Sequence, residues 1–391
     1  MQREDIQFNT VPVGDLGIIP LVSCTKMGAE VDAYISSWRK HRHGDYDGSL
    51  AMADYQKDSY LIKSANPRFG TGEAKGIIYE SVRGKDIFIL IDVCNHSITY
   101  SLFGKTNFMS PDDHFQDLKR TIAAIAGKAR RVTVIMPFLY ESRQHRRTAR
   151  ESLDCAIGLH ELYNMGVDNI ITFDAHDPRV INCSPLNGFD NPRASYQFLK
   201  WLCMNVNDIQ FDAKHLMMVS PDEGAIERSV YFASVLGINM GMFYKRRDYS
   251  TVENGMNPIV AHEFLGADVH GKDVIVVDDM ISSGGSMIST ARDLKERGAN
   301  RVFIFATFGL FTNGMEKFDR AFEEGLFDKI LTTNLIYQAP EMLSRDYYIS
   351  VDMYKYIAYL IDTLNHDVSI GDLLDPTSKI RELIDDYNRH D

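Results

Sequence analysis

Six short apolar runs recur along the chain and are separated by segments of helical length. They occupy residues 86–93, 131–137, 169–174, 215–220, 273–278 and 301–307. Their interiors are continuously apolar, which is typical of β-strands that are covered on both faces. The segments between them predict helices at residues 114–129, 152–165, 194–205, 225–236 and 285–297. Strands that alternate with helices in this way predict an α/β fold with mainly parallel sheets flanked by helices.

The two halves of the chain share a short sequence pattern. Residues 84–86 and residues 271–273 both read Gly-Lys-Asp, and each triplet opens a predicted strand that carries an Asp near its end. A helix follows in each half, and an Arg-Val pair then opens the next strand. A chance match of such short strings is the alternative to a repeat. The pattern favours two tandem copies of one α/β fold, which we expect at residues 15–190 and 191–365.

Two segments lie outside this repeat. Residues 36–66 are rich in polar side chains, and we expect them to form an insertion on the surface. The tail at residues 366–391 contains a short amphipathic stretch at 380–384 with charged residues on both sides. This stretch predicts a terminal helix.

Composition narrows the classes of function. The chain has 391 residues, of which 45% are apolar and 25% charged, as in ordinary globular proteins with two or three domains. The net charge of −12 argues against nucleic-acid binding as the main role, because that role needs a basic surface. A local basic pocket that binds a small anion is compatible with this net charge.

Hydropathy and cysteine usage indicate a cytoplasmic protein without membrane contact. Every apolar run is far shorter than the roughly 18 residues of a membrane-spanning helix. The charged start of the chain, Met-Gln-Arg-Glu-Asp, predicts no signal peptide. The five cysteines are scattered and form no CxxC pair, so neither a zinc site nor a disulfide framework is expected.

The strongest chemical signal lies at the end of the predicted strand 273–278. Asp278 and Asp279 end this strand, and a loop of serine and glycine at residues 282–286 leads into a helix. Glycine lets the backbone approach a phosphate, which the amides at a helix N-terminus stabilise. Carboxylates repel phosphate but accept hydrogen bonds from sugar hydroxyls. The pattern therefore predicts a sugar-phosphate pocket; a capped helix with two solvated Asp side chains is the alternative.

This stretch resembles the ribose-5-phosphate loop of type I phosphoribosyltransferases. Further motifs, in the order in which the family has them, resemble the ribose-phosphate pyrophosphokinase branch over about residues 15–375. They are Arg-Phe-Gly-Thr-Gly-Glu at 68–73, Arg-Gln at 143–144, Asp-Ala-His at 174–176, Ser-Pro-Asp-Glu-Gly at 220–224 and Lys-Arg-Arg at 245–247. The resemblance implies two tandem phosphoribosyltransferase-like domains, of which the first binds nucleotide and the second carries the ribose phosphate and pyrophosphate loops.

The resemblance also implies a role for each motif residue. The implied ATP-binding residues are Phe69, Thr71, Glu73, Arg143 and Gln144. The implied ribose-5-phosphate-binding residues are Asp278, Asp279, Ser282, Ser283, Gly284, Gly285 and Ser286. The implied ligands of Mg²⁺ are His176 and Asp222, and the implied catalytic cations are Lys245 and Arg247. Without the surrounding motif, Phe69 would be read equally well as a core aromatic residue.

The sequence departs from the family at several of these motifs. The family usually has an acidic residue where this chain has Ser282, and a second glycine where it has Ala225. It commonly has Asp or Asn at the place of Thr71, and Asp at the place of His145. The loop after His145 is one residue shorter than usual. These differences indicate a divergent member of the family.

The resemblance implies a reaction and its partners. ATP and ribose 5-phosphate give AMP and 5-phosphoribosyl 1-diphosphate when the anomeric hydroxyl attacks the β-phosphorus of Mg-ATP. A homo-oligomer, either a dimer or a hexamer, is implied as well. Two alternatives stay open: a phosphoribosyltransferase, which would not need the nucleotide motifs at residues 69–73 and 143–144, and a non-catalytic regulatory homologue, which would be free to lose Lys245, Arg247 or His176.

Overall fold

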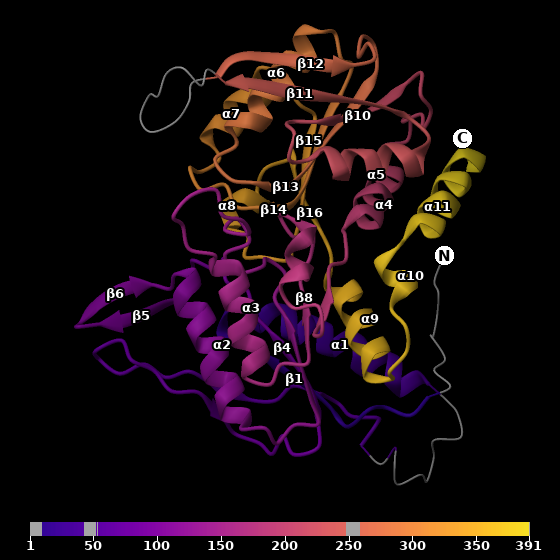
Figure 1. Ribbon diagram of the computed structural model, residues 1–391. Coiled ribbons are helices and arrows are strands. Elements are labelled where there is room, and N and C mark those ends of the chain that lie inside the picture. Colours follow the sequence, from indigo (N-terminus) through magenta and orange to yellow (C-terminus); the bar gives the residue numbers. More distant parts are fainter. Residues whose placement is uncertain (1–9, 43–51, 53, 248–258, 391) are drawn as a thin grey trace. The chain divides into compact units, whose positions relative to one another are not determined.

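The computed structural model describes residues 10–42, 52, 54–247 and 259–390, with residues 245–247, 259–262 and 390 described by their backbone alone. The chain divides into two compact units (Figure 1). Unit 1 contains residues 1–193, 335–337 and 352–375, and unit 2 contains residues 194–334, 338–351 and 376–391. The expected boundary near residue 190 lies close to the first of these divisions. The expected limits of the second domain differ, because residues 352–375 pack with unit 1.

Unit 1 is built around a five-stranded parallel sheet. Its strands, in spatial order, are β1 (Leu16–Pro20), β4 (Asp86–Leu90), β7 (Arg131–Ile135), β8 (Asn169–Ile171) and β9 (Gly188–Asp190). Its main helices are α1 (Thr25–His41), α2 (Pro111–Ile125), α3 (Asp154–Asn164) and α9 (Tyr354–Asn365). The three strands and two helices predicted between residues 86 and 174 are confirmed. The elements α1, β1 and α9 were not predicted from the sequence.

Unit 2 has the same parallel core with two extra strands at one edge. The spatial order is β12 (Ile259–Gly266), β11 (Asn239–Arg247), β10 (Leu216–Ser220), β13 (Asp273–Ile281), β14 (Val302–Gly309), β15 (Lys329–Thr333) and β16 (Tyr348–Val351). The five strands from β10 to β16 run parallel, whereas β12 is antiparallel to β11. The main helices are α4 (Ser195–Asn205), α5 (Ile226–Leu236), α6 (Gly285–Glu296), α7 (Glu316–Glu323) and α11 (Thr377–His390). The strands and helices predicted in this half are therefore confirmed.

The same ion pair joins two neighbouring strands in each unit. In unit 1, Asp86 on β4 accepts hydrogen bonds of 2.9 and 2.8 Å from Nε and Nη2 of Arg131 on β7. In unit 2, Asp273 on β13 accepts bonds of 3.0 and 2.6 Å from the same two nitrogens of Arg301, just before β14. The repeated sequence pattern is thus a repeated structural element, and the chain contains two tandem phosphoribosyltransferase-type folds.

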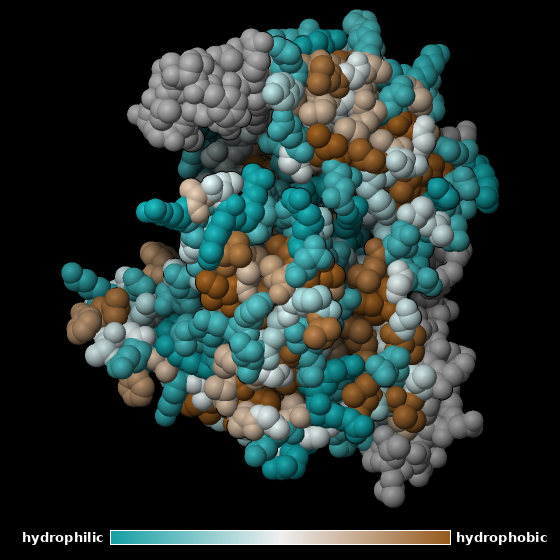
Figure 2. All heavy atoms as spheres, in the orientation of Figure 1, coloured by the Kyte–Doolittle hydropathy of each residue, from teal (hydrophilic) through white to brown (hydrophobic). Residues whose placement is uncertain are grey.

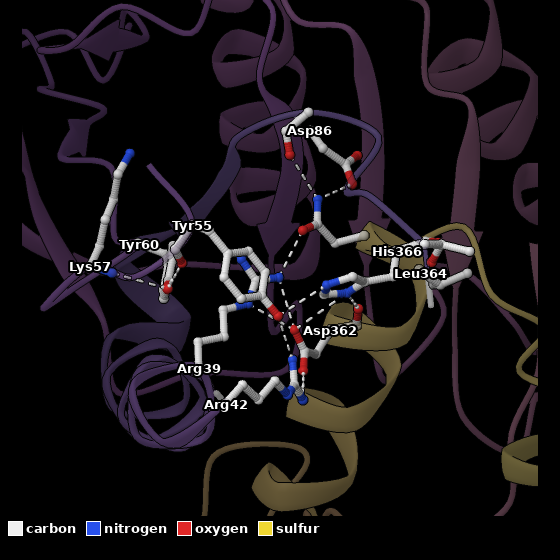
Figure 3. A network of polar contacts seen from close by, with 12 residues as sticks. Arg39, Arg42, Tyr55, Lys57, Tyr60, Asp86, Asp362, Leu364 and His366 are labelled. Carbon is white, nitrogen blue, oxygen red and sulfur yellow. Dashed lines mark hydrogen bonds and ion pairs between the residues drawn. The ribbon is translucent and has the colours of Figure 1, made fainter. Parts of the chain in front are cut away.

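The expectation of a surface insertion at residues 36–66 is wrong where the structure describes this segment. Arg39 and Arg42 are buried, and both pair with Asp362 on α9, at 2.8 and 2.5 Å (Figure 3). Arg39 also donates a 2.7 Å hydrogen bond to Asn365. These arginines lie inside unit 1 because α9, which comes from the far end of the chain, supplies their acceptors. Residues 43–51 and 53 lie outside the described residues.

The predicted terminal helix is present as α11 and packs against α4 and α5 of unit 2. Ile380 is fully buried, and the hydroxyl of Tyr387 donates a 2.7 Å hydrogen bond to the carbonyl of Val206. The tail after residue 375 is therefore part of the fold of unit 2. In the described segments of the chain, no helix has both the length and the apolar character needed to cross a membrane.

Candidate functional site

The loop between β13 and α6 in unit 2 needs glycine at its centre. Gly284 has φ 79°, in the left-handed region, and a Cβ atom there would overlap the ring of Phe318. Position 284 therefore excludes every other residue type unless Phe318 moves. The loop is also held from its other side, because the carbonyl of Ser282 accepts a 3.0 Å hydrogen bond from the amide of Thr312.

The N-terminus of α6 is suited to bind an anion. Gly284 is its N-cap residue and makes no side-chain cap to the amides of the first turn. Ser283, Gly285 and Ser286 are exposed around it. Uncapped amides at a helix N-terminus attract a phosphate through their hydrogen-bond donors and the helix dipole. The alternative reading of this loop as a conventionally capped helix is therefore not supported.

Three carboxylates gather at the neighbouring ends of β10 and β13. Asp279 is 3% exposed, and its amide donates a 2.8 Å hydrogen bond to Oδ1 of Asp278. Burial and the negative charges of Asp279 and Asp222 raise the pKa of Asp278 well above its ordinary value. Such a shift indicates that a proton, a cation or a hydroxyl donor bound beside these carboxylates is favourable.

Arg228 belongs to this site, although the sequence analysis did not select it. It lies in the first turn of α5, is buried, and brings Nη2 to within 3.9 Å of Oδ2 of Asp279. Its positive charge lowers the pKa of Asp278, opposing part of the upward shift. An arginine in the first turn of the predicted helix 225–236, next to the Ser-Pro-Asp-Glu-Gly loop, would have been the available signal.

Asp222 shapes the loop between β10 and α5. Its Oδ1 accepts a 2.9 Å hydrogen bond from the amide of Gly224, and its carbonyl accepts a 2.6 Å bond from the hydroxyl of Ser220. The side chain therefore has a structural role in the turn. Its role as a metal ligand stays a prediction.

The two predicted cations lie at the end of β11. In the antiparallel pair of β11 and β12, Lys245 pairs with His262 and Arg247 pairs with Ile259. A bulge separates Arg246 from Arg247. The side chains of Lys245 and Arg247 lie outside the described residues, so only their place in the strand is established.

In unit 1, Phe69 lies in a tight loop on the surface. It is 55% exposed, which excludes the reading as a core aromatic residue. Its amide donates a 2.7 Å hydrogen bond to the carbonyl of Glu73, and the hydroxyl of Thr71 donates a 2.8 Å bond to Oε2 of Glu73. The loop thus brings Phe69, Thr71 and Glu73 together; their role in ATP binding stays a prediction.

The Phe69 loop rests against the hairpin of β5 (Thr99–Leu102) and β6 (Lys105–Phe108). The amide of Phe103, at the turn of the hairpin, donates a 2.8 Å hydrogen bond to the carbonyl of Gly70. Phe103 and Phe108 are 78% and 66% exposed, and apolar side chains are visible on this hairpin in Figure 2. The exposed phenylalanine at position 69 is therefore part of a larger apolar surface.

Arg143 and Gln144 lie in the turn after β7. Arg143 is exposed, and Gln144 donates a 2.9 Å hydrogen bond to the carbonyl of Ser152. The next residue, His145, brings its ring to 5.4 Å from the ring of His176. The structure thus places the Arg-Gln segment beside His176, which lies in the loop after β8. His145 itself was noted in the sequence only as a departure from the family.

Both loops of unit 1 pack on the same helix, α2. Arg68 donates a 2.9 Å hydrogen bond to Asp117, and the hydroxyl of Tyr140 donates a 2.6 Å bond to Asp112. The predicted ATP-binding residues are therefore attached to one rigid element. The structure also groups Asp222, Asp278 and Asp279 with the serine-glycine loop in unit 2. Among the described residues, no three His, Cys, Asp or Glu side chains form a closed metal site.

Comparisons with known proteins agree with this geometry. The N-terminal domain model of ribose phosphate pyrophosphokinase matches residues 18–166, and the phosphoribosyl transferase domain model matches residues 193–340. The ribose-phosphate pyrophosphokinase of Vibrio parahaemolyticus is 30% identical over 308 residues, which is 78% of this chain and 88% of that protein. The enzyme of that name from Buchnera aphidicola is 32% identical over 260 residues, or 66% of this chain and 74% of that protein.

A solved structure has the same fold. The phosphoribosylpyrophosphate synthetase of Mycobacterium smegmatis matches with a TM-score of 0.70 over 90% of this chain and 99% of that chain, at 20% sequence identity. The two matched family models together cover more than half of the sequence. The chain therefore belongs to the ribose-phosphate pyrophosphokinase family.

Proposed function

We propose that this protein transfers the pyrophosphoryl group of ATP to the anomeric hydroxyl of ribose 5-phosphate. The products are AMP and 5-phosphoribosyl 1-diphosphate. The observation that carries this proposal is the uncapped N-terminus of α6 beside the carboxylates of Asp278 and Asp279, in a chain of this family. The anion site matches the phosphate group of a sugar phosphate, and the carboxylates match its sugar hydroxyls.

In unit 2, the loop at residues 282–286 binds the 5-phosphate in this proposal. The amides of the first turn of α6 and the serine hydroxyls donate to its oxygens. Asp278 and Asp279 accept from the ribose hydroxyls, which fixes the sugar with its anomeric hydroxyl directed away from the loop. Arg228 holds Asp279 in place. The protein thereby contributes position rather than covalent chemistry.

In unit 1, the loop at residues 69–73 binds the adenine base in this proposal. The exposed ring of Phe69 offers a face for stacking, and Glu73 accepts from the amino group of the base. Arg143 and Gln144 bind the phosphates, because a guanidinium group matches phosphate oxygens with its planar donors. Thr71 already donates to one oxygen of Glu73 and so fixes its direction.

The donor set fits Mg²⁺. This ion keeps several waters and takes one or two protein carboxylates, so an open group of oxygens suits it better than a closed cage. Burial and the charges of Asp279 and Asp222 raise the pKa of Asp278 well above its ordinary value, so a cation bound beside these carboxylates would be stabilised. We propose Asp222 as a ligand of Mg²⁺ in unit 2 and His176 as a ligand of Mg²⁺ in unit 1; a bound ion would neutralise phosphate oxygens. Lys245 and Arg247 add positive charge where it develops in the transition state.

The decisive experiment follows the fate of ATP. We expect protein incubated with Mg²⁺, ATP and ribose 5-phosphate to form AMP, detected by chromatography, only when all three are present. ADP in place of AMP would show ordinary phosphoryl transfer and contradict the proposal. If no nucleotide is consumed while ribose 5-phosphate still binds, the chain is a regulatory homologue.

A second experiment tests the assignment of unit 2. Asp279→Asn is expected to weaken ribose 5-phosphate binding while leaving ATP binding largely unchanged, in separate titrations of the two ligands. Asp268→Asn is the matched control, because Asp268 is an exposed aspartate of the same unit. An equal loss of both ligands in Asp279→Asn would instead indicate misfolding or a metal role.

A further inference from the structure

His145 connects two loops of unit 1 that the proposed function uses separately. Its Nδ1 lies 3.2 Å from the carbonyl oxygen of Ser142, in the turn after β7. Its Nε2 lies 3.2 Å from Oδ2 of Asp177, in the loop after β8. The side chains of His145 and Asp177 are 12% and 10% exposed, so this contact is largely shielded from water.

Both ring nitrogens of His145 face oxygen atoms that only accept hydrogen bonds. A ring N–H can donate to either oxygen, so the side chain bridges the two loops by its geometry. An Asp at position 145 would instead direct a second carboxylate at Asp177. The residue is therefore matched to its partner in this chain, and the sequence difference at position 145 has a structural reason.

Asp177 is itself fixed from the other side. It caps the short helix Pro178–Cys183 by accepting a 2.9 Å hydrogen bond from the amide of Arg179, and it accepts further bonds from the guanidinium of Arg179. A side chain held by its own loop is a firm anchor for His145. His176 precedes Asp177 directly, and its ring meets that of His145 at 5.4 Å and 60°.

We propose that His145 is a positioning residue that holds His176 against the Arg143–Gln144 turn. It acts through its hydrogen bond to Asp177 and through its ring contact with His176. This inference rests on the proposed function, in which the turn and His176 serve the same nucleotide. Partners that orient a ligand residue in this way typically change affinity or activity by about 10- to 100-fold when they are removed.

Two variants remove the contact between His145 and Asp177, one from each side. His145→Phe keeps a ring beside His176 but has no N–H group to donate, whereas Asp177→Asn removes the carboxylate and keeps the cap. Each is expected to lower kcat/KM for ATP about tenfold, with the dissociation constant of ribose 5-phosphate unchanged. The double variant is expected to be no worse than either single one, because both remove one interaction. His160→Gln, on an exposed histidine of α3, is the matched control.

A readout apart from activity is the NMR signal of the His176 ring in protein labelled with ¹³C-histidine. We expect it to shift in His145→Phe and in Asp177→Asn but not in His160→Gln. An unmoved His176 signal, or additive losses in the double variant, would overturn the inference. So would an equal loss of ribose 5-phosphate binding, which would indicate general damage to the fold. If the parent protein forms no AMP, the proposed function fails, and the NMR signal still decides the contact.

Discussion

Strand β4 of unit 1 leads, through the β5–β6 hairpin, to a helix with a side-chain cap, whereas the corresponding strand β13 of unit 2 leads to a helix without one. In unit 1, Ser110 and Asp113 cap α2 reciprocally, at 3.2 and 3.0 Å, with Pro111 as the first helical residue. In unit 2, Gly284 leaves the first turn of α6 without a side-chain cap. The N-cap side chain of α2 accepts from an amide of the first turn, whereas the N-cap glycine of α6 has no side chain that could do so. The difference supports the proposed sugar-phosphate site in unit 2.

The starts of the strands are alike in the two units. Asp168 accepts a 2.7 Å hydrogen bond from the amide of Val132, at the start of β7. Asp328 accepts a 2.8 Å bond from the amide of Val302, at the start of β14. Together with the paired Asp and Arg side chains described above, these bonds fix the same strand register twice. The shared scaffold lies at one end of each sheet, and the divergence lies at the other.

The carboxylates at the far strand ends have different partners. Asp92, just beyond β4, is buried and accepts hydrogen bonds of 2.8 and 2.6 Å from the amides of Cys94 and Tyr337. Its oxygens are thus used by the backbone of unit 1. Asp278 and Asp279 instead lie beside Asp222 and Arg228, at the edge of the serine-glycine loop. The corresponding position in the fold has a structural role in unit 1 and belongs to the proposed site in unit 2.

The largest effect is expected from Asp92→Asn. Burial raises the pKa of Asp92 from 3.8 to about 7, so the folded protein holds this proton more tightly than the unfolded chain does. The stabilisation is therefore complete below about pH 4 and is lost as the pH rises through 7. About three pKa units correspond to about 4 kcal/mol. The free energy of unfolding of the parent, relative to that of the variant, should fall by this order between pH 4 and 8.

Chemical denaturation of both proteins across this pH range measures the difference directly. Asp268→Asn is the control for the loss of a carboxylate at an exposed position. A constant difference for Asp92→Asn would mean that this carboxylate is ionised in the fold and is stabilised by its amide partners. The contrast with the carboxylates of unit 2 would then be weaker.

The next effect concerns β11 and β12, which extend the sheet of unit 2 beyond β10. In the described part of unit 1, β1 ends the sheet at the corresponding edge. Lys245→Ala is expected to lower kcat at least about 100-fold, as the loss of one preorganised electrostatic group does. The KM for ribose 5-phosphate should change little, because the cation acts on charge that develops in the transition state. Steady-state kinetics measure both constants.

Lys317→Ala is the control for this experiment, because Lys317 is an exposed lysine on α7 of the same unit. A kcat within a few-fold of the parent in Lys245→Ala would make Lys245 an ordinary surface residue. The extra strands β11 and β12 would then not distinguish unit 2 from unit 1 by a catalytic role.

Local sequence patterns predicted the strands well, because β4 and β13 are buried along their whole first five residues. The need for glycine in the loop around position 284 could also be predicted, because glycine lets a backbone turn approach a phosphate closely. Arg39 was misread as a surface residue. Its acceptor Asp362 lies 323 positions away, and no local pattern reports such a pair. The contact of His145 could not be predicted for the same reason, because its partner Asp177 lies in another loop.

The third prediction breaks the open turn itself. Gly284→Ala places a Cβ at φ 79° and against Phe318, so the loop must shift. We expect the affinity for ribose 5-phosphate to fall about tenfold or more, with strain of about 1–3 kcal/mol in the fold. Isothermal titration and thermal unfolding measure the two effects.

Gly84→Ala in unit 1 is the matched control for this variant. Gly84 has φ 74°, and a Cβ there meets no atom within 4 Å, so it carries the backbone strain without the clash. It should lower stability and leave ribose 5-phosphate binding unchanged. If Gly84→Ala weakens binding as much as Gly284→Ala does, strain anywhere in the chain damages the site, and the open turn has no special part in it.

The smallest effect is expected from Ser282→Asp, which gives the loop the acidic residue that its relatives usually have. The carbonyl of Ser282 is bonded to Thr312 through the backbone, so the exchange leaves the loop in place. A carboxylate here can accept a ribose hydroxyl or a water of Mg²⁺, but it also lies near the 5-phosphate. At about 6 Å and an effective dielectric constant near 20, two unit charges repel by roughly 3 kcal/mol before screening.

Whether this repulsion is offset depends on the cation around the loop. We therefore expect Ser282→Asp to raise kcat/KM for ribose 5-phosphate a few-fold at high Mg²⁺ and to lower it at low Mg²⁺. Ser282→Asn is the matched control, because it has a similar shape without the charge and should show a weaker dependence on Mg²⁺. A loss for Ser282→Asp at every Mg²⁺ concentration would contradict this. The open end of unit 2 would then be a site rebuilt around serine, as different from its relatives as it is from the capped end of unit 1.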